Sequence, residues 1–126
     1  NVLGFIVLSA LFEQRPSAWF WAGIVSIAII DAWLWLYATR VEQYCGLSGV
    51  LYGLFAVSIV SAWRATRRRW IVTAATLAVI GKTLWEGISG AAWIAHTAWP
   101  TLPGAHYVGF AAGLLVAAFH WEARQA

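Results

Sequence analysis

Apolar residues fill five stretches of the chain, at about residues 1–12, 18–37, 44–63, 70–89 and 104–121. Polar residues and prolines interrupt the sequence between them, as in the segment EQRP at 13–16 and the link that holds Pro100 and Pro103. Polar runs and prolines are typical of helix ends. The pattern therefore predicts five helices in one all-α domain that covers residues 1–126.

The length of these stretches matches the thickness of a lipid bilayer. A helix rises about 1.5 Å per residue and the hydrocarbon core is about 30 Å thick, so a spanning helix needs about 20 residues. The last four stretches meet this requirement, whereas the first would span only about 18 Å. We predict a polytopic membrane helical bundle with four full transmembrane helices, and we expect residue 1 to lie inside a fifth helix of a longer protein.

Composition excludes an ordinary soluble domain. Hydrophobic residues make up 62% of the chain and charged residues 10%, against roughly 25% charged residues in soluble domains. Four of the basic residues form one cluster at residues 64–69. Such a cluster between two apolar stretches is typical of a cytoplasmic membrane loop, so a nucleic-acid partner is not expected.

The alternating direction of successive membrane helices predicts that Ser48 and His106 lie near the same face of the membrane. The first, third and fifth helices must run in the same direction, with Ser48 about four and His106 about two residues inside their helices, so both lie near one boundary. The arginines at 64–69 follow the third helix, and positive charge collects on the cytoplasmic side. Ser48 and His106 are therefore predicted near the outer face.

Ser48 lies in the segment GLSGVLYG, where a helix is expected to begin. Backbone N–H groups lack intrahelical partners there and the helix dipole is positive, so an oxyanion at Ser48 would be stabilised, with Gly46 and Leu47 in support. The alternative is a packing role, because small residues four apart, such as Gly49 and Gly53, form contact faces between membrane helices.

His106 begins the last predicted helix and shares one face of it with Gly109 and Gly113. A stripe of small residues lets another backbone approach, so the histidine is expected to point at a neighbouring helix. Imidazole can accept the proton of Ser48 during acyl transfer. Tyr52 lies one turn after the serine and is predicted to pack against the ring, with general aromatic packing or interface anchoring as its alternative.

The two segments together resemble a known family. GLSGVLYG resembles the Gly-x-Ser-Gly motif of rhomboid intramembrane serine proteases, and HYVGFAAG resembles their His-x-x-Gly-x-x-x-Gly helix. The motifs occur in the family's order, with room for one intervening helix. The resemblance implies a serine endopeptidase with Ser48 as nucleophile, His106 as general base, no cofactor and a membrane-anchored protein as substrate. It also implies that Asn1 matches an asparagine that helps to bind the oxyanion.

A narrower resemblance rests on the segment KTLWE, from Lys82 to Glu86. It is similar to rhombosortases, the bacterial rhomboid branch that processes Gly-Gly-containing C-terminal sorting signals, although Tyr52 replaces the histidine of many rhombosortases. This resemblance implies an inner-membrane protein whose active site faces the periplasm. From the residues alone, Lys82 and Glu86 lie one turn apart and are expected to form an ion pair; the alternatives are that they hold the outer link or contact a polar end of the substrate.

The other polar residues receive simpler interpretations. His120 lies about 21 Å along the helix from His106, too far to join Ser48. Asp31 is expected to pair or cap inside the bundle, with a functional role as its alternative. Cys45 is expected to pack as a small residue, with a reactive thiol as its alternative. The chain's three histidines lack the spacing of a metal site, and no phosphate-binding loop follows a strand, so neither a metal nor a nucleotide is expected.

Two other functions remain open from the sequence. A non-catalytic rhomboid relative would bind membrane clients, but such a relative is expected to lack Ser48 or His106. A small transporter would use the histidine with Asp31, Lys82 and Glu86 to line a polar path. No pattern in the sequence indicates an oligomeric state.

Overall fold

The computed structural model describes residues 2–12, 16–37, 46–65, 69–90 and 102–122. These residues form five helices and no strand, which confirms the all-α prediction: α1 (Val2–Phe12), α2 (Pro16–Tyr37), α3 (Ser48–Ala65), α4 (Arg69–Ser89) and α5 (Pro103–Glu122). Apart from the start of α3, the helix bounds lie close to those that the apolar pattern predicts.

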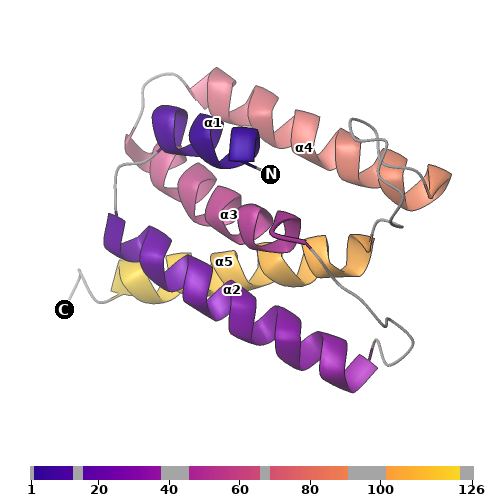
Figure 1. The fold of residues 1–126 in the computed structure, drawn as a ribbon. Helices are drawn as coiled ribbons and strands as arrows, with labels where there is room; N and C mark the ends of the chain where they lie inside the picture. The colour runs from indigo at the N-terminus through magenta and orange to yellow at the C-terminus, as the bar shows by residue number, and fades with distance from the viewer. Residues whose placement is uncertain (1, 13–15, 38–45, 66–68, 91–101, 123–126) are drawn as a thin grey trace.

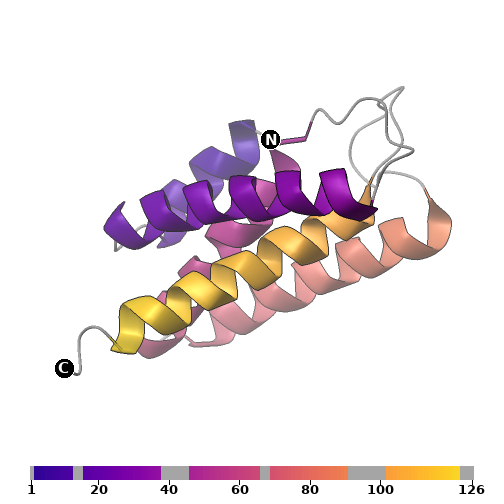
Figure 2. The ribbon, with the colours of Figure 1, turned by 90° about the horizontal axis from the view of Figure 1, so that it is seen from below.

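The central helix of the bundle is α3, which contacts each of the other four helices. In Figure 1 it lies in the middle, with α1 and α4 on one side and α2 and α5 on the other. Figure 2 shows the bundle after a 90° turn about the horizontal axis from the view of Figure 1, and in it α1 and α4 lie on opposite sides of α3. Helices α1, α3 and α5 run in one direction and α2 and α4 in the other, so α3 and α5 begin at the same end of the bundle.

Glycines allow α3 and α5 to approach until their backbones touch. A Cβ atom on Gly109 would overlap the carbonyl group of Gly49, and one on Gly113 would overlap the carbonyl group of Gly53. Both helices repeat these glycines at four-residue spacing, so the pairs form one continuous contact face. Gly53 also lies against Ser26 of α2, and the same face therefore fixes the positions of three helices.

Apolar side chains fill most of the interior, and several hydroxyl groups form hydrogen bonds within it. Trp19 Nε1 of α2 donates to Ser58 Oγ of α3 at 2.9 Å, and Ser58 Oγ donates to the carbonyl of Leu54 at 2.7 Å. Other hydroxyls also donate to the carbonyl four residues earlier, at Ser9, Thr73, Thr76 and Thr83. Such bonds satisfy a hydroxyl within its own helix, which suits apolar surroundings.

Two helices, α2 and α4, are long and apolar enough to cross a membrane. The apolar segment Ser48–Arg64 of α3 is shorter than these two helices. Many large apolar side chains nevertheless point outward from the bundle, among them Trp35, Ile88 and Phe119. Four full membrane crossings therefore remain a prediction, whereas the two long apolar helices are a feature of the fold.

The glycine contact predicts that Gly113→Ala lowers the stability of the bundle. The new methyl group would meet backbone atoms of α3, which cannot rotate away, and overpacking of this kind costs about 1–3 kcal/mol. The measurement is thermal unfolding in detergent micelles, followed by circular dichroism.

The matched control is Gly81→Ala on α4, where a Cβ atom would meet nothing within 4 Å. Its expected effect is neutral to stabilising by up to about 1 kcal/mol, because alanine favours the helix over glycine. Equal melting temperatures for the two variants would contradict the close contact between α3 and α5.

Candidate active site

Helix α3 begins at Ser48 itself, so the prediction that the serine lies about four residues inside a helix is wrong. The Leu51 amide donates to the Leu47 carbonyl at 3.0 Å, which makes Leu47 the N-cap residue. The physical reason for the late start is Gly46, because glycine loses more backbone freedom in a helix than other residues do. The amides at the start of α3 therefore lack carbonyl partners within the helix.

His106 lies in the first turn of α5, at the end of the bundle where α3 also begins. Pro103 opens this helix, a position that suits proline because the first helical N–H has no partner in any case. The Ala105 amide donates to the Leu102 carbonyl at 3.0 Å and tightens the turn. His106 is only 5% exposed, so its ring faces the interior.

The structure brings Ser48 and His106 together. His106 Nε2 lies 3.0 Å from Ser48 Oγ, within hydrogen-bond distance. The ring of Tyr52 stacks on the imidazole, with 4.5 Å between the ring centroids and an angle of 3° between the planes. The tyrosine thus restricts rotation of the imidazole and keeps Nε2 directed at the serine.

A hydrogen bond to α4 holds Tyr52 in turn. Its phenol oxygen lies 2.6 Å from Thr83 Oγ1. Thr83 Oγ1 donates its single proton to the Val79 carbonyl at 2.7 Å, so the tyrosine is the donor and the threonine the acceptor. This bond joins the ring that covers His106 to the neighbouring helix.

Lys82 and Glu86 form the ion pair that their spacing predicts. Lys82 Nζ lies 2.7 Å from each carboxylate oxygen of Glu86 and 5.9 Å from the centroid of the Tyr52 ring. The carboxylate points inward, with 3% of the Glu86 side chain exposed. Glu86 Oε2 lies 3.9 Å from His106 Nδ1, the ring nitrogen opposite to the one that faces Ser48.

An apolar groove of about 240 Å³ runs between α3, α4 and α5 and reaches the imidazole. Its wall includes two ring systems of the site, Tyr52 and His106, and apolar side chains from all three helices. The residues that line it are Tyr52, Phe55, Thr76, Val79, Ile80, Thr83, Leu84, His106, Tyr107, Phe110, Ala111 and Leu114. A groove of this kind can accept an extended or helical apolar segment beside the serine.

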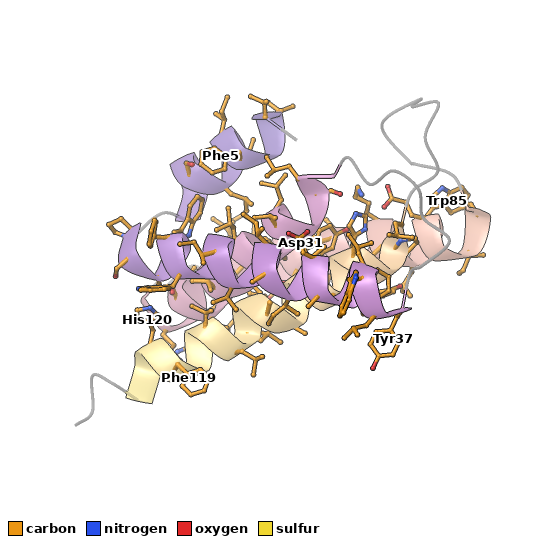
Figure 3. The ribbon with its side chains drawn as sticks, turned by 60° about the horizontal axis from the view of Figure 1, so that its bottom comes forward. Phe5, Asp31, Tyr37, Trp85, Phe119 and His120 are labelled. Atoms are coloured by element: carbon orange, nitrogen blue, oxygen red, sulfur yellow. The ribbon has the colours of Figure 1, made fainter. Side chains whose placement is uncertain are left out.

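Other candidates lie away from this cluster. Figure 3 shows His120 at the opposite end of the bundle from Trp85. Asp31 is exposed on α2, so the expectation that it pairs or caps inside the bundle is wrong; a short carboxylate on the outer face of α2 cannot reach the interior. Asn1 and Cys45 lie outside the described residues. Among the described residues, no three His, Cys, Asp or Glu side chains gather as in a metal site.

Sequence reasoning missed two contacts of this site. Thr83 as the acceptor for Tyr52, and the approach of Glu86 to His106, were not predicted. The signal was present in part, because residues 82, 83 and 86 share one face of a helix at spacings of three and four. The spacing did not indicate which residues of the other helices this face of α4 contacts.

Chemically, the arrangement combines a hydroxyl group, an imidazole nitrogen at 3.0 Å from it and a helix start that offers backbone N–H groups. These are the parts needed for acyl transfer. Comparisons with protein-family models, curated proteins and solved structures find no match to this chain.

Stacking on His106 predicts different results for two substitutions of Tyr52. Tyr52→Phe keeps the ring over the imidazole, so the rate at which Ser48 reacts with a fluorophosphonate probe should stay within about twofold of the parent rate. Tyr52→Leu loses the aromatic pair, and the rate should fall about 2- to 10-fold, the range that such pairs contribute. If phenylalanine and leucine lower the rate equally, the hydrogen bond to Thr83 positions the ring instead.

Proposed function

We propose that this chain is the catalytic part of a rhomboid-type intramembrane serine endopeptidase. The observation that carries the proposal is the 3.0 Å separation between Ser48 Oγ and His106 Nε2. A serine within hydrogen-bond reach of an imidazole is the arrangement of a nucleophile with its general base. The same two residues occupy the reactive positions of the two motifs that resemble the rhomboid family.

The reaction begins when Ser48 Oγ attacks the carbonyl carbon of a peptide bond and His106 Nε2 takes the hydroxyl proton. The carbonyl oxygen becomes an oxyanion, which N–H groups at the start of α3 stabilise. The C–N bond then breaks, and the imidazolium gives its proton to the leaving amine. Water, deprotonated by the same imidazole, hydrolyses the ester on Ser48 and restores the hydroxyl.

The location that we assign is a membrane, with α2 to α5 as full crossings. Support comes from the two long apolar helices and from the apolar side chains that face outward. Arg64 lies in the last turn of α3 and Arg69 at the start of α4, at the end opposite to Ser48. Positive charge collects on the cytoplasmic side, so Ser48 and His106 face the outer side of a bacterial inner membrane.

The substrate class is a membrane-anchored protein. The apolar groove beside His106 is open to a segment that is itself apolar. The KTLWE segment resembles rhombosortases, so a C-terminal Gly-Gly tail followed by an apolar helix is the specific substrate proposed. Glycines near the cleavage point would favour local unwinding, which exposes a peptide bond that a helix otherwise protects.

The direct test is covalent labelling of the detergent-solubilised protein with a fluorophosphonate probe. The parent protein should label, and Ser48→Ala and His106→Ala should each reduce labelling at least about 100-fold, as expected when nucleophile or base is removed. Ser61→Ala and His120→Ala are the matched controls, because each removes the same side chain elsewhere on the same helix. A folded parent protein that does not label would point to the client-binding relative.

The groove predicts that Ala111→Trp impairs cleavage of a membrane-anchored substrate. Ala111 lines the groove, and the indole would occupy space that the substrate needs. Specificity pockets change kcat/KM by about 10-fold or more for small changes in volume, so kcat/KM for a Gly-Gly tail fusion should fall by at least that factor.

The control for the groove is Ala118→Trp, which adds the same indole to the exposed surface of α5 outside the groove. Its kcat/KM should match that of the parent protein. Equal losses in the two variants would remove the groove from the proposed substrate path, because a general effect on α5 would explain both.

A further inference from the structure

The proposed reaction places a requirement on His106 Nδ1. When Nε2 accepts the Ser48 proton, the neutral ring must already carry its hydrogen on Nδ1. A buried N–H group needs an acceptor. In the described part of the structure, Nδ1 is buried and has no hydrogen-bond partner, and the nearby carboxylate is that of Glu86, with Oε2 at 3.9 Å.

The environment of Glu86 shows why its carboxylate lies inside the bundle. An ordinary ion pair at i, i+4 on a helix surface keeps both charged groups in contact with solvent. Here the Glu86 side chain is 3% exposed, although that of Lys82 is 28% exposed. Burial of a carboxylate is costly, and contact of both its oxygens with Lys82 Nζ at 2.7 Å offsets that cost. The lysine thus holds a buried anion beside the imidazole.

We infer that Glu86 is a positioning residue for His106: its carboxylate accepts the Nδ1–H hydrogen bond and stabilises the imidazolium that forms during catalysis, while Lys82 holds the carboxylate in place. This role rests on the proposed function, because it acts through the base of that reaction. It extends the Ser-His pair to a Ser-His-Glu relay in which the third member comes from α4.

The separation of 3.9 Å is compatible with this role. A charge-assisted N–H···O bond is about 2.8 Å long, so Oε2 must move about 1 Å toward the ring. Hydrogen bonds of catalytic residues are often long before substrate binds and shorten in the complex. The glutamate side chain can supply the movement by rotation, because Lys82 contacts both oxygens and one of these contacts persists when the other lengthens.

The kinetic test compares Glu86→Gln with Lys82→Gln in the rate of fluorophosphonate labelling. If Glu86 positions the base, Glu86→Gln removes the anion at Nδ1 and should lower the rate about 10- to 100-fold, the range of a charge-assisted hydrogen bond. Lys82→Gln should lower it less than about fivefold, and Glu86→Asp, which keeps the carboxylate on a shorter chain, should fall between Gln and the parent.

A purely structural ion pair predicts the opposite order. Lys82→Gln would then be the more damaging change, because it leaves a buried carboxylate without its cation, whereas Glu86→Gln leaves a lysine that can reach solvent. A Glu86→Gln rate within twofold of the parent rate would overturn the role of Glu86.

The second test reads the hydrogen on the imidazole directly and needs no turnover. In ¹⁵N spectra of the histidine-labelled parent protein, the resonances that His106→Ala abolishes belong to His106. They should show the tautomer protonated at Nδ1, and Glu86→Gln should shift the ring toward the tautomer protonated at Nε2. A parent protein whose His106 is protonated at Nε2 would overturn the inference, even if every Glu86 variant failed to fold.

The two tests separate the inference from the proposed function. If the probe labels Ser48 in a parent protein whose His106 is the Nε2–H tautomer, the result would support the proposed protease activity and contradict the role of Glu86. If His106 is the Nδ1–H tautomer but the probe does not label the parent protein, the result would support the contact between Glu86 and His106 and contradict the proposed protease activity.

Discussion

Direct backbone contact between α3 and α5 holds together the two helices that carry Ser48 and His106. The two backbones touch with no side chain between them, so any added side-chain atom at these positions would push the helices apart. The glycine pairs permit that packing and set the register of the two helices. Imidazole is a short side chain, and a shift of about 1 Å would break a 3.0 Å hydrogen bond to the serine.

Helix α4 meets the site by a different kind of contact. Helix α5 contacts α3 through glycines, whereas α4 contacts the site through polar groups. The Thr83 hydroxyl bonds to Tyr52, and the ion pair of Lys82 and Glu86 lies beside His106. Polar contacts have strict preferences for distance and angle, so they orient rings more sharply than apolar packing does. Small residues therefore fix the distance between α3 and α5, and polar residues fix the direction of the imidazole.

The sequence alone was sufficient for the helices, their alternating direction and the pairing of Ser48 with His106. These follow from apolar length, parity and glycine spacing, which are properties of each helix and of the chain order. The start of α3 was missed because an apolar run does not mark the residue at which backbone angles become helical. The approach of Glu86 to His106 was missed because spacing fixes a face of α4 but not its rotation or translation against α5.

The hydroxyls inside the helices differ from that of Ser48 in the acceptors that they can reach. Ser58 and Thr83 each give their proton to the carbonyl four residues earlier, and a hydroxyl engaged in this way has no proton left for a base. Ser48 is the first residue of α3, so no earlier turn of its own helix offers such an acceptor. A serine one turn deeper in α3 would have a carbonyl of its own helix within reach, as Ser58 does, and its hydroxyl could bond there instead of to His106.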